Sequence, residues 1–187
     1  KMVKEEFHKQ NLYLTGFMGS GKSTLGPIIA NTIGYTYTDL DREIEEREGI
    51  SITHIFEEKG EQHFRNVERN TLIKLSINKK QVISLGGGTL QDAGNRMTVK
   101  NHGILLYLKI EPELLIMRLK NKSDRPLLKD IDGEKLPVDE LRHRITSLLH
   151  DRQDNYQQAE LIIEIKNEKI GITVDRIVKD LKPFLAF

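Results

Sequence analysis

The sequence predicts a three-layer α/β/α protein, in which helices cover both faces of a parallel sheet. Short runs of apolar, β-branched or aromatic residues recur along the chain, and each is long enough for one strand; they are residues 12–15, 35–38, 81–85, 103–110 and 161–165. Between them, apolar residues recur at helical spacing, as at Leu25, Ile28, Ile29 and Ile33, and again within 141–149 and 174–181. Strands that alternate with helices typically form a parallel sheet with helices on both faces.

Two segments add detail to this architecture. Residues 103–108 show little alternation of apolar and polar side chains, which is typical of a central strand buried on both faces. Residues 121–140 are polar and contain two prolines and one glycine. A loop of this length in a compact domain is usually functional. We expect a mobile lid here, and we expect Asp139 to cap the helix that follows it.

Length and composition exclude several classes of protein. The 187 residues are enough for one domain with its own core and too few for two. The formal net charge of +1 argues against a general nucleic-acid or membrane binder. Cysteine is absent from the sequence, so neither a disulfide framework nor a thiolate zinc site is available. Because the start lacks the apolar stretch of a signal peptide and no run suits a membrane helix, we expect a cytoplasmic protein.

A glycine-rich segment between the first strand and the first helix matches the phosphate-binding pattern G-x-x-x-x-G-K-[ST]. The pattern is carried by Gly16, Gly21, Lys22 and Ser23. Glycines allow backbone N–H groups to surround an anion, and the following helix directs its positive end at the phosphates. Lys22 is expected to reach the outer phosphates and Ser23 to ligate Mg²⁺. The alternative is a flexible turn with Ser23 as a cap, but the motif and its context together favour the phosphate site.

Two aspartates follow the second strand and allow two interpretations. Asp39 and Asp41 are two residues apart, so both can project toward the edge of the sheet where parallel strands present ligand sites. There they would order the Mg²⁺ shell and hold an acceptor hydroxyl. Alternatively, Thr38 and Asp41 have the spacing of a capping box at a helix start. The spacing alone leaves both interpretations open.

Two further segments are candidates for the acceptor side. Arg65 and Glu68 are three residues apart on a predicted helix, with Phe56 and Phe64 nearby. Taken alone, such an arginine is more often half of a surface ion pair. The segment "SLGGGTL", residues 84–90, places three glycines directly after the third strand. Glycines at that point permit close approach of a ligand, but they also fit a flexible turn.

Taken in order, six segments carry a family resemblance. They are "GFMGSGKST", "DLD", "GEQHFR", "SLGGG", "DRPLL" and "RQDNY". This set, which spans residues 12 to about 166, resembles the shikimate kinase family. The resemblance implies a P-loop NTPase fold similar to the nucleoside-monophosphate kinases, with a parallel sheet of about five strands. It further implies a single domain over residues 1–187, a lid at about 119–138 and substrate-binding helices at about 41–77.

The resemblance also implies an activity and a set of partners. Members of this family transfer the γ-phosphoryl group of ATP to the 3-hydroxyl of shikimate, with Mg²⁺, on the route to chorismate and the aromatic amino acids. The implied partners of this chain are therefore ATP and shikimate, without nucleic acid or membrane, and we expect a monomer. Two rival functions are another small-metabolite kinase, such as a gluconate kinase, and a nucleotide-binding regulatory module without transfer activity.

Residue by residue, the resemblance implies three groups of site residues. The implied catalytic residues are Lys22, Asp41 and Arg125. The implied nucleotide-binding residues are Gly19, Ser20, Gly21, Lys22, Ser23, Thr24, Arg118 and Arg125, and the implied metal site consists of Ser23 and Asp39. The implied shikimate-binding residues are Asp41, Phe56, Phe64, Arg65, Gly86, Gly87, Gly88 and Arg152.

The last segment departs from the family pattern. "RQDNY" has Asp154 and Asn155 where the family usually has proline and leucine, although Arg152 and Tyr156 keep their places. Without the proline, a helix can run through this segment more easily. The added carboxylate, two residues from Arg152, is also a potential competitor for the charge of that arginine.

Overall fold

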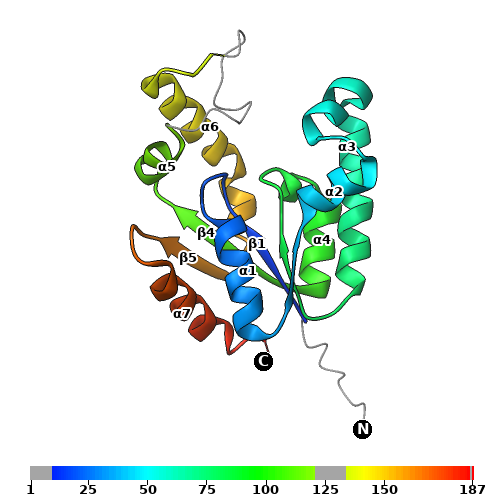
Figure 1. Ribbon diagram of the computed structural model, residues 1–187, viewed down its shortest axis with the longest axis vertical. Helices are drawn as coiled ribbons and strands as arrows, with labels where there is room; N and C mark the ends of the chain where they lie inside the picture. Colours follow the sequence, from blue (N-terminus) through cyan, green and yellow to red (C-terminus); the bar gives the residue numbers. More distant parts are fainter. Residues whose placement is uncertain (1–9, 121–133, 186) are drawn as a thin grey trace.

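A computed structural model of the chain describes residues 10–120, 134–185 and 187. Within these residues, five strands form one parallel sheet in the order β2-β3-β1-β4-β5 (Figure 1). The strands are β1 (Asn11–Thr15), β2 (Thr36–Asp39), β3 (Gln81–Ser84), β4 (Gly103–Ile110) and β5 (Leu161–Ile165). The predicted parallel sheet and its five strands are therefore confirmed.

Helices connect these strands and cover both faces of the sheet. The helices are α1 (Lys22–Ile33), α2 (Leu40–Glu48), α3 (Ile52–Ile77), α4 (Ala93–His102), α5 (Pro112–Leu119), α6 (Val138–Tyr156) and α7 (Ile170–Leu181), with a 3₁₀ turn η1 (Thr89–Gln91). Helices α1 and α7 pack together on one face, whereas α3 and α4 pack together on the other. In the described part of the chain, none of these helices is long and apolar enough to cross a membrane.

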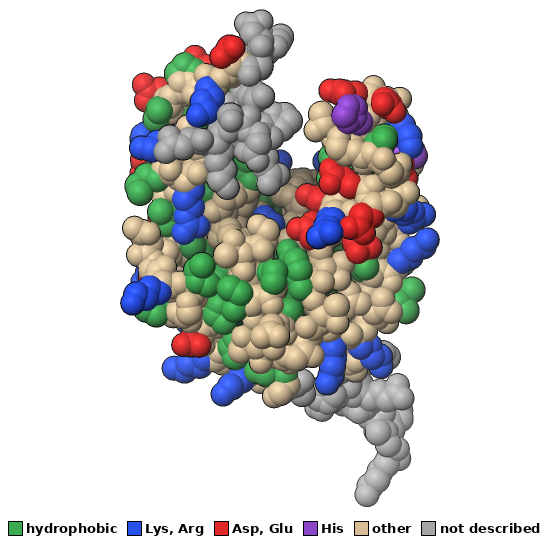
Figure 2. Space-filling model, in the orientation of Figure 1, with side chains coloured by type: hydrophobic (Ala, Val, Ile, Leu, Met, Phe, Trp, Pro, Cys, Tyr) green, Lys and Arg blue, Asp and Glu red, His purple; other side chains and the backbone are tan. Residues whose placement is uncertain are grey.

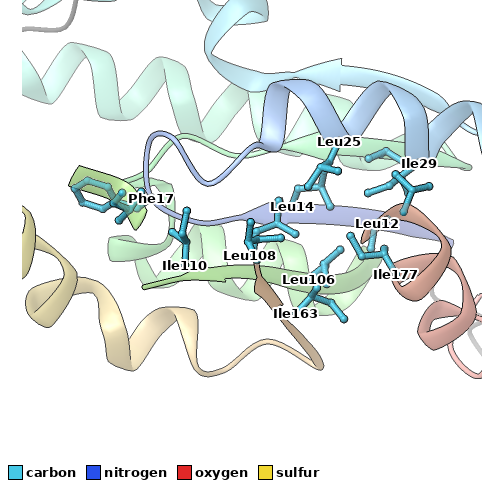
Figure 3. Packing of buried hydrophobic residues seen from close by; sticks show 14 of the residues in the cluster. Leu12, Leu14, Phe17, Leu25, Ile29, Leu106, Leu108, Ile110, Ile163 and Ile177 are labelled. Atoms are coloured by element: carbon cyan, nitrogen blue, oxygen red, sulfur yellow. The ribbon is translucent and has the colours of Figure 1, made fainter. Parts of the chain in front are cut away.

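Strand β1 is buried on both faces, and its alternating side chains enter two separate cores. Leu12 and Leu14 join the cluster that also contains Ile29 of α1 and Ile177 of α7 (Figure 3). Tyr13, which points to the opposite face as strand geometry requires, joins the cluster of α2, α3 and α4. All three side chains are fully buried. The loop that follows β1 is therefore attached to a strand whose residues are all buried.

The structure adds one detail to the predicted helices and corrects one expectation. Ile28 is 40% exposed although Leu25, Ile29 and Ile33 of the same predicted helix are buried, because successive helical residues turn by about 100° and Ile28 falls at the margin of the apolar face. Asp139 is not the cap of α6, since the helix already begins at Val138 with Pro137 at the cap position. Asp139 lies instead in the first turn, where a carboxylate still interacts favourably with the helix dipole.

The topology brings the loops after β1, β2 and β3 to one edge of the sheet. All strands are parallel, so their carboxyl ends meet there, and the chain order changes direction at β1, which lies between β3 and β4. Ligands of open α/β sheets bind at such a switch point. Figure 2 shows a hollow at this edge, between the arm formed by α2 and α3 and the side that carries α5 and α6.

Candidate active site

The phosphate loop joins β1 to α1, and its glycines have backbone conformations that other residues rarely adopt. Gly16 has a φ of +149°, and a Cβ atom there would lie 2.7 Å from Ser20 Oγ and 2.8 Å from the Leu108 carbonyl oxygen. Gly21 caps α1 with a φ of +104°. A backbone turned in this way can direct several N–H groups toward one anion. The geometry therefore suits a bound phosphate better than a merely flexible turn.

Lys22 extends its side chain back over this loop. Its Nζ atom donates hydrogen bonds to the carbonyl oxygens of Gly16, at 2.6 Å, and Phe17, at 3.3 Å. Ser23 and Thr24, in the first turn of α1, are exposed. Ser20 is fully buried, and its hydroxyl has no hydrogen-bond partner within the described residues. The loop therefore presents an ammonium group and exposed hydroxyls at the positive end of a helix.

The two aspartates that follow β2 have different positions and surroundings. Asp39 is the cap of α2, and its Oδ1 atom accepts hydrogen bonds from the backbone N–H groups of Asp41, at 3.0 Å, and Arg42, at 3.2 Å. The predicted capping box with Thr38 as the cap is therefore wrong, because Asp39 caps the helix instead. The carboxylate of Asp41 lies beside the glycines that follow β3: a Cβ atom on Gly86 would be 2.7 Å from Asp41 Oδ1.

The electrostatic surroundings of Asp41 connect the two loops. Burial, together with the negative charges of Asp39 and Glu68, raises the pKa of this carboxyl to about 6. The ammonium group of Lys22 acts in the opposite sense and lowers this pKa. Asp41 is therefore close enough to interact with both the phosphate loop and the acidic group on α3. A shifted carboxyl in a cleft is typical of a functional site.

Arg65 reaches the same glycine loop from α3. A Cβ atom on Gly88 would lie 3.2 Å from Arg65 Nη2. The guanidinium donates from Nη1 to Glu68 Oε2 at 2.9 Å, and it lies over the ring of Phe64, 5.1 Å from the ring centroid. Arg65 thus forms an ion pair with Glu68, as their spacing suggested. The pair does not lie at the surface, because the side chain of Glu68 is only 1% exposed.

Arg152 approaches the glycine loop from α6. A Cβ atom on Gly87 would lie 2.8 Å from Arg152 Nη1, and the guanidinium lies over the ring of Phe17, 5.7 Å from its centroid. One turn later, the Tyr156 hydroxyl donates to the Gly87 carbonyl oxygen at 2.8 Å. Two arginines from opposite sides of the molecule therefore meet at two adjacent glycines. Sequence reasoning assigned no role to Tyr156 or Phe17.

Two other predicted residues lie at the margins of the cleft. The rings of Phe56 and Phe64 are in contact, with centroids 4.7 Å apart. Phe64 is buried, whereas Phe56 is 38% exposed and so forms the outer edge of this apolar pair. Arg118, in the last turn of α5, donates to the Gly19 carbonyl oxygen at 3.0 Å. It therefore lies against the phosphate loop from the side opposite to α3.

Asp154 and Asn155, which replace the proline and leucine usual in the family, do not draw Arg152 away from the glycine loop. Asp154 is exposed, and no ion pair joins it to Arg152 in the part of the chain that the structure covers. Asn155 points elsewhere and donates to Gln91 Oε1 at 3.1 Å. Helix α6 runs through both positions as far as Tyr156. Arg125 and most of the expected lid, 119–138, lie outside the described residues.

A comparison with protein families identifies this arrangement. The family model described as "Shikimate kinase" matches residues 18–182, which is most of the chain. The chain belongs to the shikimate kinase family. It is therefore an ATP-using kinase with an α/β P-loop NTPase fold, as the ordered motifs predicted.

Relatives and solved structures of shikimate kinases agree with this assignment. The chain is 45% identical over 175 residues to the shikimate kinase of Chlorobaculum tepidum, a match that covers 94% of this chain and 92% of that protein. Among solved structures, a shikimate kinase from Bacteroides thetaiotaomicron aligns with a TM-score of 0.84 and 32% identity, over 92% of this chain and 98% of that one. Another, from Acinetobacter baumannii in complex with shikimate, aligns with a TM-score of 0.81 and 32% identity, over 93% of each chain.

Shikimate kinases generally need a divalent metal, and the donor groups of this site are compatible with one. Within residues 10–120, 134–185 and 187, no group of three or more histidine, aspartate or glutamate side chains forms a metal cage. Mg²⁺ usually relies instead on a few protein oxygens together with water and substrate phosphates. The exposed hydroxyl of Ser23 and the carboxylate of Asp39 are oxygen donors of this kind. Asp39 Oδ1 already accepts two backbone N–H groups, whereas Oδ2 accepts one long hydrogen bond from the Tyr37 hydroxyl, at 3.4 Å, so Oδ2 is the more available atom.

Proposed function

We propose that this chain transfers the γ-phosphoryl group of ATP to the 3-hydroxyl of shikimate, giving ADP and shikimate 3-phosphate for the synthesis of chorismate and the aromatic amino acids. The observation that carries the proposal is the convergence of Arg65, Arg152 and Asp41 on one glycine loop beside Lys22. Two guanidinium groups suit a carboxylate. A neighbouring aspartate suits the hydroxyl groups of the same small acid.

On the donor side, Lys22 can replace its hydrogen bonds within the phosphate loop by hydrogen bonds to the phosphates of ATP. Lys22 is held above the loop by the carbonyl oxygens of Gly16 and Phe17, and we propose that it turns to the outer phosphates when ATP binds. Backbone N–H groups of Gly19, Ser20 and Gly21 would surround the phosphates, with Ser23 and Thr24 at the helix start; Arg118 and Arg125 complete the proposed nucleotide site.

On the acceptor side, the proposed shikimate site is built from helix and loop together. Arg65 and Arg152 would bind the carboxylate from opposite sides, each with N–H groups fixed in one plane. Gly86, Gly87 and Gly88 lack side chains, which leaves room for the ring of the substrate. Phe56 and Phe64 would form the apolar wall of this site. Helices α2 and α3, the proposed substrate-binding helices at about 41–77, thus supply half of the proposed shikimate-binding residues, and the loop after β3 and helix α6 supply the other half.

Asp41 is the proposed partner of the reacting hydroxyl. With a pKa of about 6, the carboxyl is mostly ionised near neutral pH and can accept a hydrogen bond from the substrate. The hydroxyl oxygen forms a bond to the γ-phosphorus, the bond from that phosphorus to the bridging oxygen of ADP breaks, and the hydroxyl proton passes to Asp41. Phosphoryl transfer depends mainly on positioning and charge stabilisation. Orientation by Asp41 is therefore as important as its basicity.

The proposed metal ion is Mg²⁺, with Ser23 as a direct ligand and Asp39 as a second oxygen donor through water. Such an ion would offset the negative charge that develops on the phosphoryl group during transfer. We further propose that the chain acts as a monomer in the cytoplasm. Size-exclusion chromatography with light scattering tests the first of these two statements, because a monomer has the 21.6 kDa mass of one chain.

The direct test is a coupled assay of ADP release with shikimate, quinate, gluconate or no acceptor, each with Mg²⁺ and ATP. Of these acceptors, we expect only shikimate to support rapid release of ADP. Preference for gluconate would assign the chain to another class of small-metabolite kinase. ATP binding without acceptor-dependent turnover would favour a regulatory module instead. Mass spectrometry of the product, with one added phosphate, confirms group transfer.

A further inference from the structure

A buried threonine, Thr89, is connected to the proposed acceptor site through a carboxylate. Its hydroxyl donates to Glu68 Oε1 at 2.7 Å, and Thr89 is 0% exposed. The other carboxylate oxygen of Glu68, Oε2, accepts from Arg65 Nη1 at 2.9 Å. Glu68 is thus held between a hydroxyl on one side and a guanidinium on the other. The three side chains form one continuous chain of hydrogen bonds from η1 to the cleft.

Thr89 itself is fixed in place by α4. The side-chain amide of Asn95 donates to the Thr89 carbonyl oxygen at 3.0 Å, and Asn95 is fully buried. The backbone N–H of Asn95 donates in turn to Asp92, the cap of α4. The hydroxyl of Thr89 therefore projects from backbone that is anchored to a helix. Such an anchored donor can hold a carboxylate in one orientation.

Arg65 has a second carboxylate within reach, and this makes the orientation of Glu68 important. Glu61, one turn earlier on α3, accepts from Arg65 Nε and Nη2, each at 3.4 Å. The side chain of Glu61 is 68% exposed, whereas that of Glu68 is 1% exposed. The bond to Glu68 is shorter and draws the guanidinium toward the glycine loop. The bonds to Glu61 draw it toward solvent.

We propose that Thr89 is a positioning residue for the acceptor: its hydroxyl orients Glu68, which directs Arg65 toward the glycine loop and away from Glu61. This inference rests on the proposed function, in which Arg65 binds the carboxylate of shikimate. Without the hydroxyl, Oε1 of a buried carboxylate loses its donor, and buried charged groups left without partners are costly. Glu68 then rotates to recover a partner, and Arg65 loses its fixed direction.

The test compares Thr89→Val, which removes the hydroxyl at nearly constant volume, with Thr89→Ser, which keeps it. We expect Thr89→Val to raise the KM for shikimate by about tenfold, a typical effect of one lost hydrogen bond to a charged group. The KM for ATP should change less than about twofold, because Lys22 and the phosphate loop are untouched. Thr89→Ser should restore the shikimate KM to near that of the wild type.

The matched control is Thr71→Val on α3. Thr71 is also a buried threonine, but its hydroxyl has no hydrogen-bond partner in the described part of the chain. Removing it should leave both KM values unchanged. Thermal unfolding is measured for every variant, so that a loss of fold is separated from a loss of orientation. If Thr89→Val does not fold, Thr89→Cys, whose thiol is a weak donor, carries the same comparison.

A double variant tests the role of Glu61, the carboxylate that competes with Glu68 for Arg65. Adding Glu61→Gln to Thr89→Val should lower the shikimate KM again, because the alternative partner of Arg65 has lost its charge. A shikimate KM that is the same in Thr89→Val and the wild type overturns the positioning role. This outcome is distinct from failure of the proposed function, in which the wild-type enzyme itself shows no shikimate-dependent release of ADP.

Discussion

Replacing Asp41 by asparagine should make the protein more stable and, at the same time, nearly inactive. The substitution keeps the size of the side chain and removes its charge. In the native structure this charge is buried and lies near the negative charges of Asp39 and Glu68, which the ammonium group of Lys22 partly offsets. A residue that is costly for folding but suited to catalysis is typical of active sites.

The magnitude follows from the pKa of Asp41, which rises from the usual 3.8 to about 6 on folding. One pKa unit corresponds to about 1.4 kcal/mol, so ionisation of Asp41 costs about 3 kcal/mol of folding free energy as an upper estimate. Because the pKa of Asp41 is higher in the folded than in the unfolded state, its carboxyl stabilises the folded state fully below about pH 4. This contribution to the free energy of unfolding is lost as the pH rises through about 6.

The assay is thermal or urea unfolding of Asp41→Asn and the wild type at pH 4 and pH 7. At pH 7 we expect the variant to gain up to about 3 kcal/mol, or about 6 to 12 °C in Tm for a chain of this size. At pH 4 the two proteins should differ little, because the wild-type carboxyl is then protonated. The control is Asp175→Asn, an exposed aspartate of α7, which should change stability by less than about 0.5 kcal/mol.

Kinetics complete this prediction. We expect kcat of Asp41→Asn to fall by about a hundredfold or more, because the amide cannot accept the proton of the acceptor hydroxyl. In the wild type, kcat/KM for shikimate should decrease as the pH falls below about 6. Equal or lower stability of the variant at pH 7 would refute the argument from buried charge. Near wild-type turnover would remove Asp41 from the reaction.

Three further substitutions probe the acceptor site. Arg65→Ala should raise the KM for shikimate by about a hundredfold with little change in the KM for ATP; an unchanged KM for shikimate excludes Arg65 from the site. Gly87→Ala should weaken shikimate binding, since the new Cβ would lie 2.8 Å from Arg152 Nη1 and displace that guanidinium; isothermal titration with shikimate measures this, and wild-type affinity contradicts it. Tyr156→Phe should lower the free energy of unfolding by about 1 kcal/mol, because the Gly87 carbonyl loses its donor; urea unfolding checks this value, and an unchanged midpoint shows that the bond contributes nothing.

The donor side is encoded more locally in the sequence than the acceptor side. A phosphate loop is local: its glycines, lysine and helix start are consecutive residues, so one motif describes the whole structure. The acceptor side brings together α2, α3, the loop after β3 and α6. Helical spacing placed Arg65 beside Glu68, but spacing does not reveal whether such a pair is exposed. Only packing against η1 shows that Glu68 is buried.

Some residues escaped sequence reasoning because their role depends on distant neighbours. Thr89 is one polar residue after three glycines, and its significance comes from Glu68, twenty-one positions earlier. Asp39 was expected to support a metal, and its part as the cap of α2 became visible only with the backbone N–H groups around it. Asp154 lay close enough to Arg152 in sequence to suggest competition. Both residues lie on α6, and helical residues two positions apart do not face each other.

The sequence by itself determined the class of the protein. Alternating strands and helices specify a parallel sheet with two helical layers, and six ordered motifs specify a kinase that uses ATP, because each element and each motif is encoded within a few consecutive residues. Tertiary structure alone decided which charges are buried and which side chains face one another. Burial and long-range contact depend on how separate helices pack across the sheet, and no local pattern of residues records that arrangement.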